Sequence, residues 1–334
     1  MSIPNNIQQV FFEQIKDRLP THISLVHELA EVLNISDDGV YRRLRCKTSL
    51  TFDEIQLLAT KYGLSVDSLM GNQLGAITFS YPRFVDKHFN YEQYLNDIAN
   101  NLETIASFDE KQIIHVVKDI PFFHLFHIPE IGAFKLFFWA RTIFDNPELK
   151  DKLFSLEEDM SDKMIELGKN IINTYIKIPS IELWNEEAIH ATLKQIEIYC
   201  EAGLFRNKKE AVILCDKLIE LLSHIKSQAE YGFKYLYGLK PVGRDGNYKL
   251  YRNELILGDN ANIVKTGDTK TTYINYNSLN FLQTTNAAFC QETEEWLNNL
   301  IKRSSLISSA SERQRNQFFL TMEEKVNKLK EKIT

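Results

Sequence analysis

Four cations lie close together in the first quarter of the chain. The run from 41 to 47 contains Arg42, Arg43, Arg45 and Lys47 and no acid. Guanidinium and ammonium groups bind phosphates, and arginine also donates paired hydrogen bonds to guanine. A helix face that is merely solvated more often carries charges of both signs. The cluster therefore predicts a local contact with double-stranded DNA.

Other residues that could do chemistry form weaker patterns. His124 and His127 are three apart and could share a helix face that binds a metal ion. Pro121 and Pro129 bracket a segment too short for a stable helix, however, and no third ligand follows at a diagnostic spacing. We expect partly buried histidines there. Neither a Ser-His-Asp nor a Cys-His arrangement is indicated, so we expect no catalytic residue, metal or cofactor, and no enzyme.

The elements that position the cations follow from capping residues and apolar spacing. Ser24 is expected to cap a helix over 25–33, Asn34 permits a left-handed turn, and Ser36 caps the next helix, over 37–45. Within 37–45 the inward stripe is Val40 and Leu44, which leaves Arg42, Arg43 and Arg45 pointing away from it.

A further helix is predicted from Thr51, which forms a capping box with Glu54, through Tyr62. Gly63 ends this helix, and a last short apolar turn, 66–70, follows. Helices of this length and spacing, joined by tight turns, have the layout of a helix-turn-helix.

With these elements, the segment resembles the DNA-binding domain of the lambda-repressor-like (Cro/C1-type) family. The resemblance rests on the run 28–36 (Glu-Leu-Ala-Glu-Val-Leu-Asn-Ile-Ser), on 40–43 (Val-Tyr-Arg-Arg), and on Ile55, Leu58, Ala59 and the run 62–69. It covers about the first 70 of 334 residues. It implies a five-helix domain over 1–71 whose third helix enters the major groove, usually as part of a homodimer. The DNA-binding residues expected on this basis are Ser36, Asp37, Asp38, Tyr41, Arg42, Arg43, Arg45 and Lys47.

The segment departs from the family pattern at two helix starts. Family members often place glutamine at the start of the second and third helices, where this chain has Val26 (or Leu25) and Asp37. Asp37 and Asp38 favour the helix dipole but repel phosphates. Residues 1–71 hold seven Lys/Arg and nine Asp/Glu, a net charge of −2 (7 − 9). We therefore expect modest, selective and dimer-dependent DNA binding.

The composition is that of an ordinary globular protein, with 44% apolar and 25% charged residues. A net charge of −6 argues against coating nucleic acid or an anionic membrane along the whole chain. Four cysteines lie far apart, and we expect neither a signal peptide nor a membrane-spanning segment. A reducing, cytoplasmic location and no membrane partner are the expectation.

Beyond a linker at 72–90, the pattern predicts a mainly α chain in two further regions. Region 91–237 reads as α-helical, with an antiparallel helix pair at 184–202 and 208–231 and one short strand at 112–118. Region 238–334 reads as α+β. It has a small antiparallel meander of three runs, covered by two helices; the runs are 249–257, 261–266 and 269–276, and the helices are 286–302 and 309–332.

The last helix carries an apolar stripe with the 3, 4, 3, 4 spacing of a coiled coil. Either the stripe packs against the chain's own sheet, or it forms the homodimer contact that operator binding by this family usually needs. The stripe consists of Phe319, Met322, Val326, Leu329 and Ile333.

Together these patterns predict a DNA-binding transcriptional regulator whose later regions sense an effector or form the dimer. The aromatic-rich stretch at 122–139 could line a pocket for a small-molecule or peptide effector, although core packing would use the same residues. One alternative is a protein-interaction scaffold that has lost DNA binding. Another is an enzyme joined to the N-terminal domain.

Overall fold

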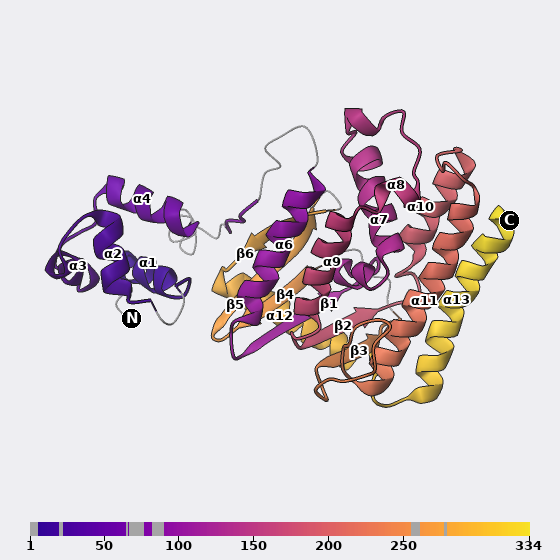
Figure 1. Ribbon diagram of the computed structural model, residues 1–334. Coiled ribbons are helices and arrows are strands. Elements are labelled where there is room, and N and C mark those ends of the chain that lie inside the picture. Colours follow the sequence, from indigo (N-terminus) through magenta and orange to yellow (C-terminus); the bar gives the residue numbers. More distant parts are fainter. Residues whose placement is uncertain are drawn as a thin grey trace. The chain divides into compact units, whose positions relative to one another are not determined.

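A computed structural model describes residues 6–19, 23–64, 66, 77–81, 90–254, 261–276 and 279–334. The chain divides into two units, Met1–Ser80 and Tyr81–Thr334 (Figure 1). The predicted linker at 72–90 lies mostly outside the described residues, as does most of the expected apolar turn at 66–70.

Unit 1 contains four described helices, α1 (Ile7–Lys16), α2 (Leu25–Leu33), α3 (Asp37–Leu44) and α4 (Phe52–Tyr62). Their apolar faces meet in one small core, which satisfies the rule that an amphipathic helix must bury its apolar stripe. The fully packed residues of this core are Phe11, Phe12, Ile15, Leu29, Val40, Leu58 and Leu64.

The ends of these helices are held by the residues that the sequence singled out. Asn34 adopts the left-handed conformation (φ 52°) after α2, and the Ser36 hydroxyl accepts a hydrogen bond from the Gly39 N–H. Thr51 and Glu54 form the reciprocal capping box of α4, and Gly63 ends that helix at φ 60°. Ser24 occupies the N-cap of α2, but its side chain makes no capping hydrogen bond.

Unit 2 is built on a seven-stranded mixed sheet in the order β6-β5-β4-β1-β2-β3-β7. Strands β1, β2 and β3 are parallel, and every other neighbouring pair is antiparallel. The strands are β1 (Lys111–Val116), β2 (Ser180–Trp184), β3 (Tyr248–Arg252), β4 (Ala261–Thr266), β5 (Thr269–Tyr276), β6 (Asn280–Thr284) and β7 (Ser305–Leu306).

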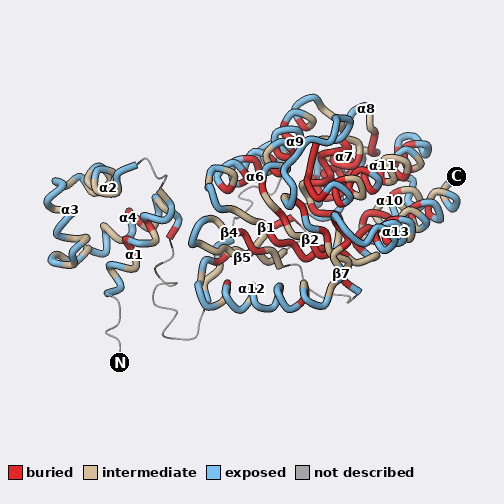
Figure 2. Tube along the Cα trace, turned by 90° about the horizontal axis from the view of Figure 1, so that it is seen from below, coloured by how far each residue is buried: buried red, intermediate tan, exposed pale blue. Residues whose placement is uncertain are grey.

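Helices cover the two faces of this sheet unequally. Figure 2 shows α12 (Ala287–Lys302) on one side of the sheet and most other helices on the opposite side. Those others are α6 (Tyr91–Ala106), α7 (Pro129–Phe138), α8 (Leu156–Asp159), α9 (Asp162–Tyr175), α10 (His190–Glu201), α11 (Lys209–Tyr231) and α13 (Glu312–Ile333), with a 3-10 helix η1 (Phe122–His127), a π-turn η2 (Trp139–Ile143) and a 3-10 turn η3 (Pro147–Leu149). The larger core lies on the side of these helices, and a smaller one lies under α12.

This arrangement corrects the predicted division at 237. Strands β1 and β2 come from the region expected to be α-helical and occupy the middle of the sheet, so 91–237 and 238–334 belong to one unit. The predicted meander is also different. Strand β3 pairs in parallel with β2 and not with β4, while β4 and β5 form the expected hairpin, and β6 extends it. The mainly helical character of the chain is confirmed.

The stripe predicted for dimerisation is occupied within the chain. Helix α13 packs along α11, and Phe319, Met322 and Val326 are completely buried there. Leu329 is 9% exposed, and Ile333 is half-buried against the same core. These side chains are therefore not available to a second chain, and intramolecular packing is the alternative that the structure shows. The helix pair α10 and α11 is present, but residues 180–184 form a strand before it.

Candidate nucleic-acid interface and ligand cavity

Helix α3 presents an exposed polar face. Tyr41 is 46% exposed, and Arg42, Arg45 and Lys47 are exposed as well. The guanidinium carbon of Arg45 lies 5.7 Å from the centre of the Tyr41 ring. Tyr41 and Arg45 are four residues apart, so they occupy the same row of the helix surface. None of these side chains contributes to the core of unit 1.

The acids at the start of α3 sit beside this face. Asp38 pairs with Arg42 at 2.9 Å, one helical turn apart, and both side chains are largely exposed. An exposed pair of this kind is worth at most about 1 kcal/mol, so Arg42 can exchange Asp38 for another anion at little cost. Asp37 is exposed in the first turn, where the helix dipole favours it. The Ser36 hydroxyl is engaged in the cap.

Arg43 does not belong to the exposed face, contrary to the sequence-based expectation. Its side chain is only 16% exposed and donates two hydrogen bonds to Glu54, at 2.7 and 3.3 Å, and one to the Gly39 carbonyl. Burial opposes ionisation of Glu54, but the hydrogen bond from Arg43 holds the pKa of this carboxyl below its usual value. Arg43 therefore joins α3 to α4.

Gln8, which no sequence pattern singled out, also positions α3. Its amide N–H groups donate to the carbonyls of Arg43 (2.7 Å) and Thr48 (2.9 Å), and its carbonyl accepts from the Leu50 N–H (2.9 Å). These bonds fix the loop that follows α3 to helix α1. The backbone segment that carries Arg45 and Lys47 is thus held by Gln8 at both of its ends.

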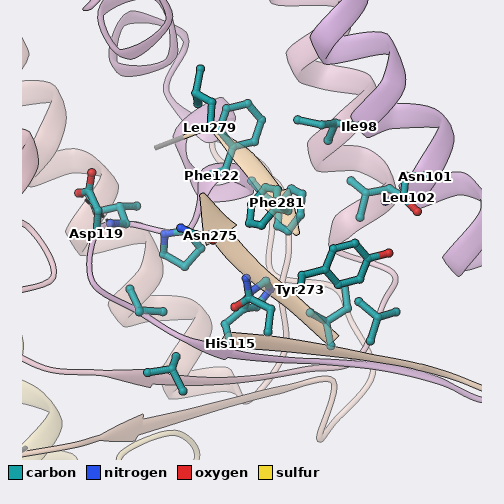
Figure 3. A pocket seen from close by; sticks show the side chains of 18 of the residues that line it. Ile98, Asn101, Leu102, His115, Asp119, Phe122, Tyr273, Asn275, Leu279 and Phe281 are labelled. Carbon is teal, nitrogen blue, oxygen red and sulfur yellow. Dashed lines mark hydrogen bonds between the residues drawn. The ribbon is translucent and has the colours of Figure 1, made fainter. Parts of the chain in front are cut away.

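A second candidate site is a cavity of about 220 Å³ in unit 2, between α6 and the sheet (Figure 3). Ile98 and Leu102 line it from α6, and Phe122 lines it from the 3-10 helix η1. The walls are mostly apolar and contain several aromatic rings. The aromatic lining residues are Tyr94, Phe122, Phe123, Trp139, Tyr273 and Phe281.

Three polar side chains of the cavity wall come from the strands, and Asn101 is added from α6. His115 on β1 lies beside Asn262 on β4, with its Nδ1 atom 3.1 Å from the Asn262 carbonyl oxygen. Burial lowers the pKa of His115 to about 4, so the ring is neutral at pH 7. The Nε2 atom of His115 and the Oδ1 atom of Asn275, on β5, are both buried without a hydrogen-bond partner.

Among the described residues that line the wall, Asp119 is the one charged side chain, and it is already neutralised. Asp119 accepts hydrogen bonds from Lys135 Nζ at 2.6 Å and from the Thr192 hydroxyl at 2.8 Å. Lys135 is completely buried and also donates to Gln195 at 2.8 Å. The cavity therefore offers a ligand neutral dipoles and aromatic surface, with no unpaired charge among the lining residues that the structure describes.

Behind this wall lies a fully buried carboxylate, Glu182, at the centre of β2. Each of its oxygens accepts two hydrogen bonds. One oxygen accepts from His124 Nε2 (2.9 Å) and the Tyr175 hydroxyl (2.5 Å), and the other accepts from Trp184 Nε1 (2.8 Å) and the Tyr248 hydroxyl (3.0 Å). Burial opposes ionisation, but His124 outweighs it and holds the pKa of Glu182 far below its usual range.

The two histidines considered as metal ligands are thus parts of polar networks. His124 binds Glu182, while His127 Nε2 lies 3.1 Å from the Gln228 amide nitrogen. His224 approaches the same amide at 3.0 Å. Among the residues that the structure describes, no group of three or more His, Cys, Asp or Glu side chains is arranged to hold a metal ion.

Comparison with known proteins adds no relative. No family model, curated protein or solved structure matched the chain. Of the helices within the described ranges, none combines the length and the hydropathy needed to cross a bilayer.

Proposed function

We propose that the chain is a DNA-binding transcriptional regulator in which α3 reads the major groove and unit 2 receives an effector. The observation that carries this proposal is the exposed face of α3, where Tyr41, Arg42, Arg45 and Lys47 lie together and serve no purpose in the core. The resemblance of residues 24–71 to the lambda-repressor-like family supports the same assignment.

Each residue of this face suits a particular contact. The major groove of B-form DNA admits an α-helix, and an arginine on that helix can donate two hydrogen bonds to guanine O6 and N7. Arg45 fills this role in the proposal. Lys47, in the loop after α3, contacts a phosphate. Arg42 leaves Asp38 for the DNA, and Asp37 accepts a hydrogen bond from cytosine N4.

The proposed binding is local and moderate in strength. Only three cations of the face remain free for DNA, since Arg43 is committed to Glu54. The acids at the start of α3 oppose phosphates nearby. We do not propose α13 as a dimer interface, because its stripe is buried against α11.

Selection from a randomised duplex pool tests the proposal. The full chain is expected to retain a subset of fragments that share a short motif, and Arg45→Ala is expected to lose the preference at one base pair of that motif. Lys47→Ala, the matched change of a phosphate contact, should weaken retention of all fragments evenly. Retention of no fragments at low salt would overturn the proposal.

A protein-interaction scaffold is the second candidate, and one observation favours it. Phe52, at the start of α4, is 88% exposed, and a groove next to it is lined by Ile55, Ala59 and Leu64. Large exposed apolar side chains of this kind often mark protein contacts. A folded chain that fails to retain DNA would favour this candidate.

A further inference from the structure

We propose that the cavity beneath α6 binds a small, neutral, planar aromatic molecule that donates hydrogen bonds to Asn275 and His115. This names the chemical class of the effector and in that sense rests on the proposed function. Binding at the cavity is nevertheless measured without DNA, so the two proposals can fail separately.

The volume sets the size of the molecule. An apolar cavity of about 150 Å³ already binds benzene. The cavity in unit 2 is about 220 Å³, which leaves room for one fused ring system or one ring with short substituents. A peptide or a nucleotide would not fit, and this excludes the larger ligands considered from the sequence.

The walls favour a flat aromatic body. Phe122 packs edge-on against Tyr94, with ring centres 5.6 Å apart, and lies 5.9 Å from the Trp139 ring. Tyr273 and Phe281 meet edge-on at 6.2 Å on the side of β5 and β6. Aromatic rings gain from offset stacking and edge-to-face contact beyond the area they bury. A planar ring inserted among these side chains makes such contacts on several sides. Figure 3 shows how Phe122, Tyr273 and Phe281 lie around the cavity.

The polar groups require a ligand without net charge. Lys135 already compensates Asp119, and His115 is neutral because burial lowers its pKa to about 4. An ion placed here would lose its hydration with no opposite charge to replace it, which is strongly unfavourable. Charged ligands are therefore rejected.

The two unpartnered atoms specify hydrogen-bond donors. Because the Asn262 carbonyl oxygen accepts from His115 Nδ1–H, the Nε2 atom of His115 carries only a lone pair. The Oδ1 atom of Asn275 is likewise an acceptor. A buried acceptor without a partner destabilises the folded chain, and a ligand N–H or O–H removes this penalty. The ligand thus presents donors and not acceptors to this side.

Calorimetric titration of the full chain at pH 7.5 with three probes tests the inference. The first probe, 5-hydroxyindole, is neutral and has two donors. The second, 5-methoxy-1-methylindole, has the same ring system with both donors capped. The third, indole-5-carboxylate, carries a charge. We expect saturable one-to-one binding of 5-hydroxyindole and at least tenfold weaker binding of the other two.

Variants locate the binding. Ile98→Phe adds bulk to the cavity from α6 and is expected to abolish binding of 5-hydroxyindole. Ile165→Phe, an equally half-buried isoleucine on α9 outside the cavity, should leave it unchanged. Asn275→Leu should weaken binding at least tenfold. Circular dichroism confirms that each variant is folded.

Several results would overturn the inference. They are absence of binding by the wild-type chain, equal affinity for the capped probe, and an Ile98→Phe variant that is folded and still binds. Binding of 5-hydroxyindole by a chain that retains no DNA would instead leave the cavity site intact and remove the proposed function.

Discussion

Arg42 and Arg43 are adjacent in the sequence but differ in what they do. Arg42 is exposed and paired only with Asp38 one turn away, whereas Arg43 is mostly buried and bonded twice to Glu54. The position next to the inward residues Val40 and Leu44 places Arg43 at the edge of the core. Of these two cations, only Arg42 is free to meet DNA.

Replacing each arginine by alanine should separate stability from binding. Arg43→Ala leaves Glu54 without its partner and is expected to lower the unfolding free energy of unit 1 by about 1.5–3 kcal/mol. Arg42→Ala, the control, should cost less than about 1 kcal/mol, because its ion pair is exposed. Chemical denaturation followed by circular dichroism measures both. If both substitutions lowered the unfolding free energy equally, Arg43 would not join α3 to α4.

The role of Glu182, like that of Arg43, depends on the residues that surround its side chain. All four of its partners donate hydrogen bonds, so the site is built for an ionised carboxylate. Glu182→Gln would turn an amide N–H toward donors and is expected to cost about 3–5 kcal/mol of unfolding free energy in unit 2. Glu187→Gln, at an exposed position shortly after β2, should change the unfolding free energy little. A stable Glu182→Gln protein would contradict the assigned network.

The sequence could not reveal these two roles. Glu54 was recognised as a capping residue, but its pairing with Arg43 depends on the packing of α3 against α4. The partners of Glu182 come from β2, β3, α9 and the 3-10 helix η1, and His124 lies 58 residues away. Spacing along the chain carries no information about such contacts, so the sequence predicts His124 as a partly buried histidine but not its bond to Glu182.

At the scale of elements, helices with clear caps were predicted well. The starts of α3 and α4 and the end of α4 follow from Ser36, Thr51, Glu54 and Gly63, whose effects are local. Strand β2 was missed because Glu182 interrupts its apolar run, and residues 184–202 continue with a helical pattern. The parallel pairing of β3 with β2 was missed because crossovers join segments that are far apart in sequence.

The stripe on α13 shows a related difficulty. Its spacing correctly predicts one apolar face, but the same face suits a second chain or the chain's own α11. The spacing of apolar residues shows which face of a helix is buried, but it does not show what packs against that face. Only the arrangement of the other elements decides between the two alternatives.

Substitution at Met322 tests that packing. Met322 is completely buried, and Met322→Ala is expected to lower the unfolding free energy of unit 2 by about 2–5 kcal/mol. Leu320→Ala, at a 55% exposed position on the same helix, should have an effect within about 0.5 kcal/mol. Light scattering should give the same molar mass for the wild-type and both variant chains. If Met322→Ala lowered the molar mass, the stripe on α13 would instead be a dimer contact.

At the scale of the whole molecule, three buried histidines make the stability of unit 2 depend on pH. Burial lowers the pKa of His115 and of His224 to about 4, and it lowers that of His127 well below the usual 6.5. The unfolded chain therefore binds more protons than the folded chain between pH 6.5 and 4. The stability contributed by these neutral rings is complete above pH 6.5 and is lost as the pH falls toward 4.

We expect the unfolding free energy of unit 2 to fall as the pH drops from 7 to 5. Each histidine contributes up to about 1.4 kcal/mol per pH unit. Urea denaturation followed by tryptophan fluorescence isolates unit 2, because all three tryptophans (139, 184 and 296) lie in it. His224→Phe should reduce the slope by about one proton, and the exposed His190→Phe should not. A flat profile would contradict this account.

The cavity is also a property of the whole unit. Its walls come from α6, the 3-10 helix η1 and four strands, and two of the lining residues, Tyr94 and Leu279, lie 185 residues apart along the chain. The sequence indicated only that aromatic residues were abundant at 122–139. Whether they fill a core or leave a space depends on the packing of all these elements.

The central claim is that the exposed face of α3 binds duplex DNA. The most direct test is the salt dependence of binding to a labelled random duplex. One variant combines Arg42→Ala, Arg45→Ala and Lys47→Ala. The control variant also loses three positive charges, but in unit 2. It replaces the exposed residues Lys302, Arg303 and Arg313 by alanine.

Each phosphate contact contributes a slope of about −0.9 to the plot of log affinity against log salt. We predict a slope of about −2 to −3 for the wild-type chain and for the control, and loss of measurable binding for the α3 variant. Absence of binding by the wild-type chain at low salt, or equal losses in the two triple variants, would contradict the claim.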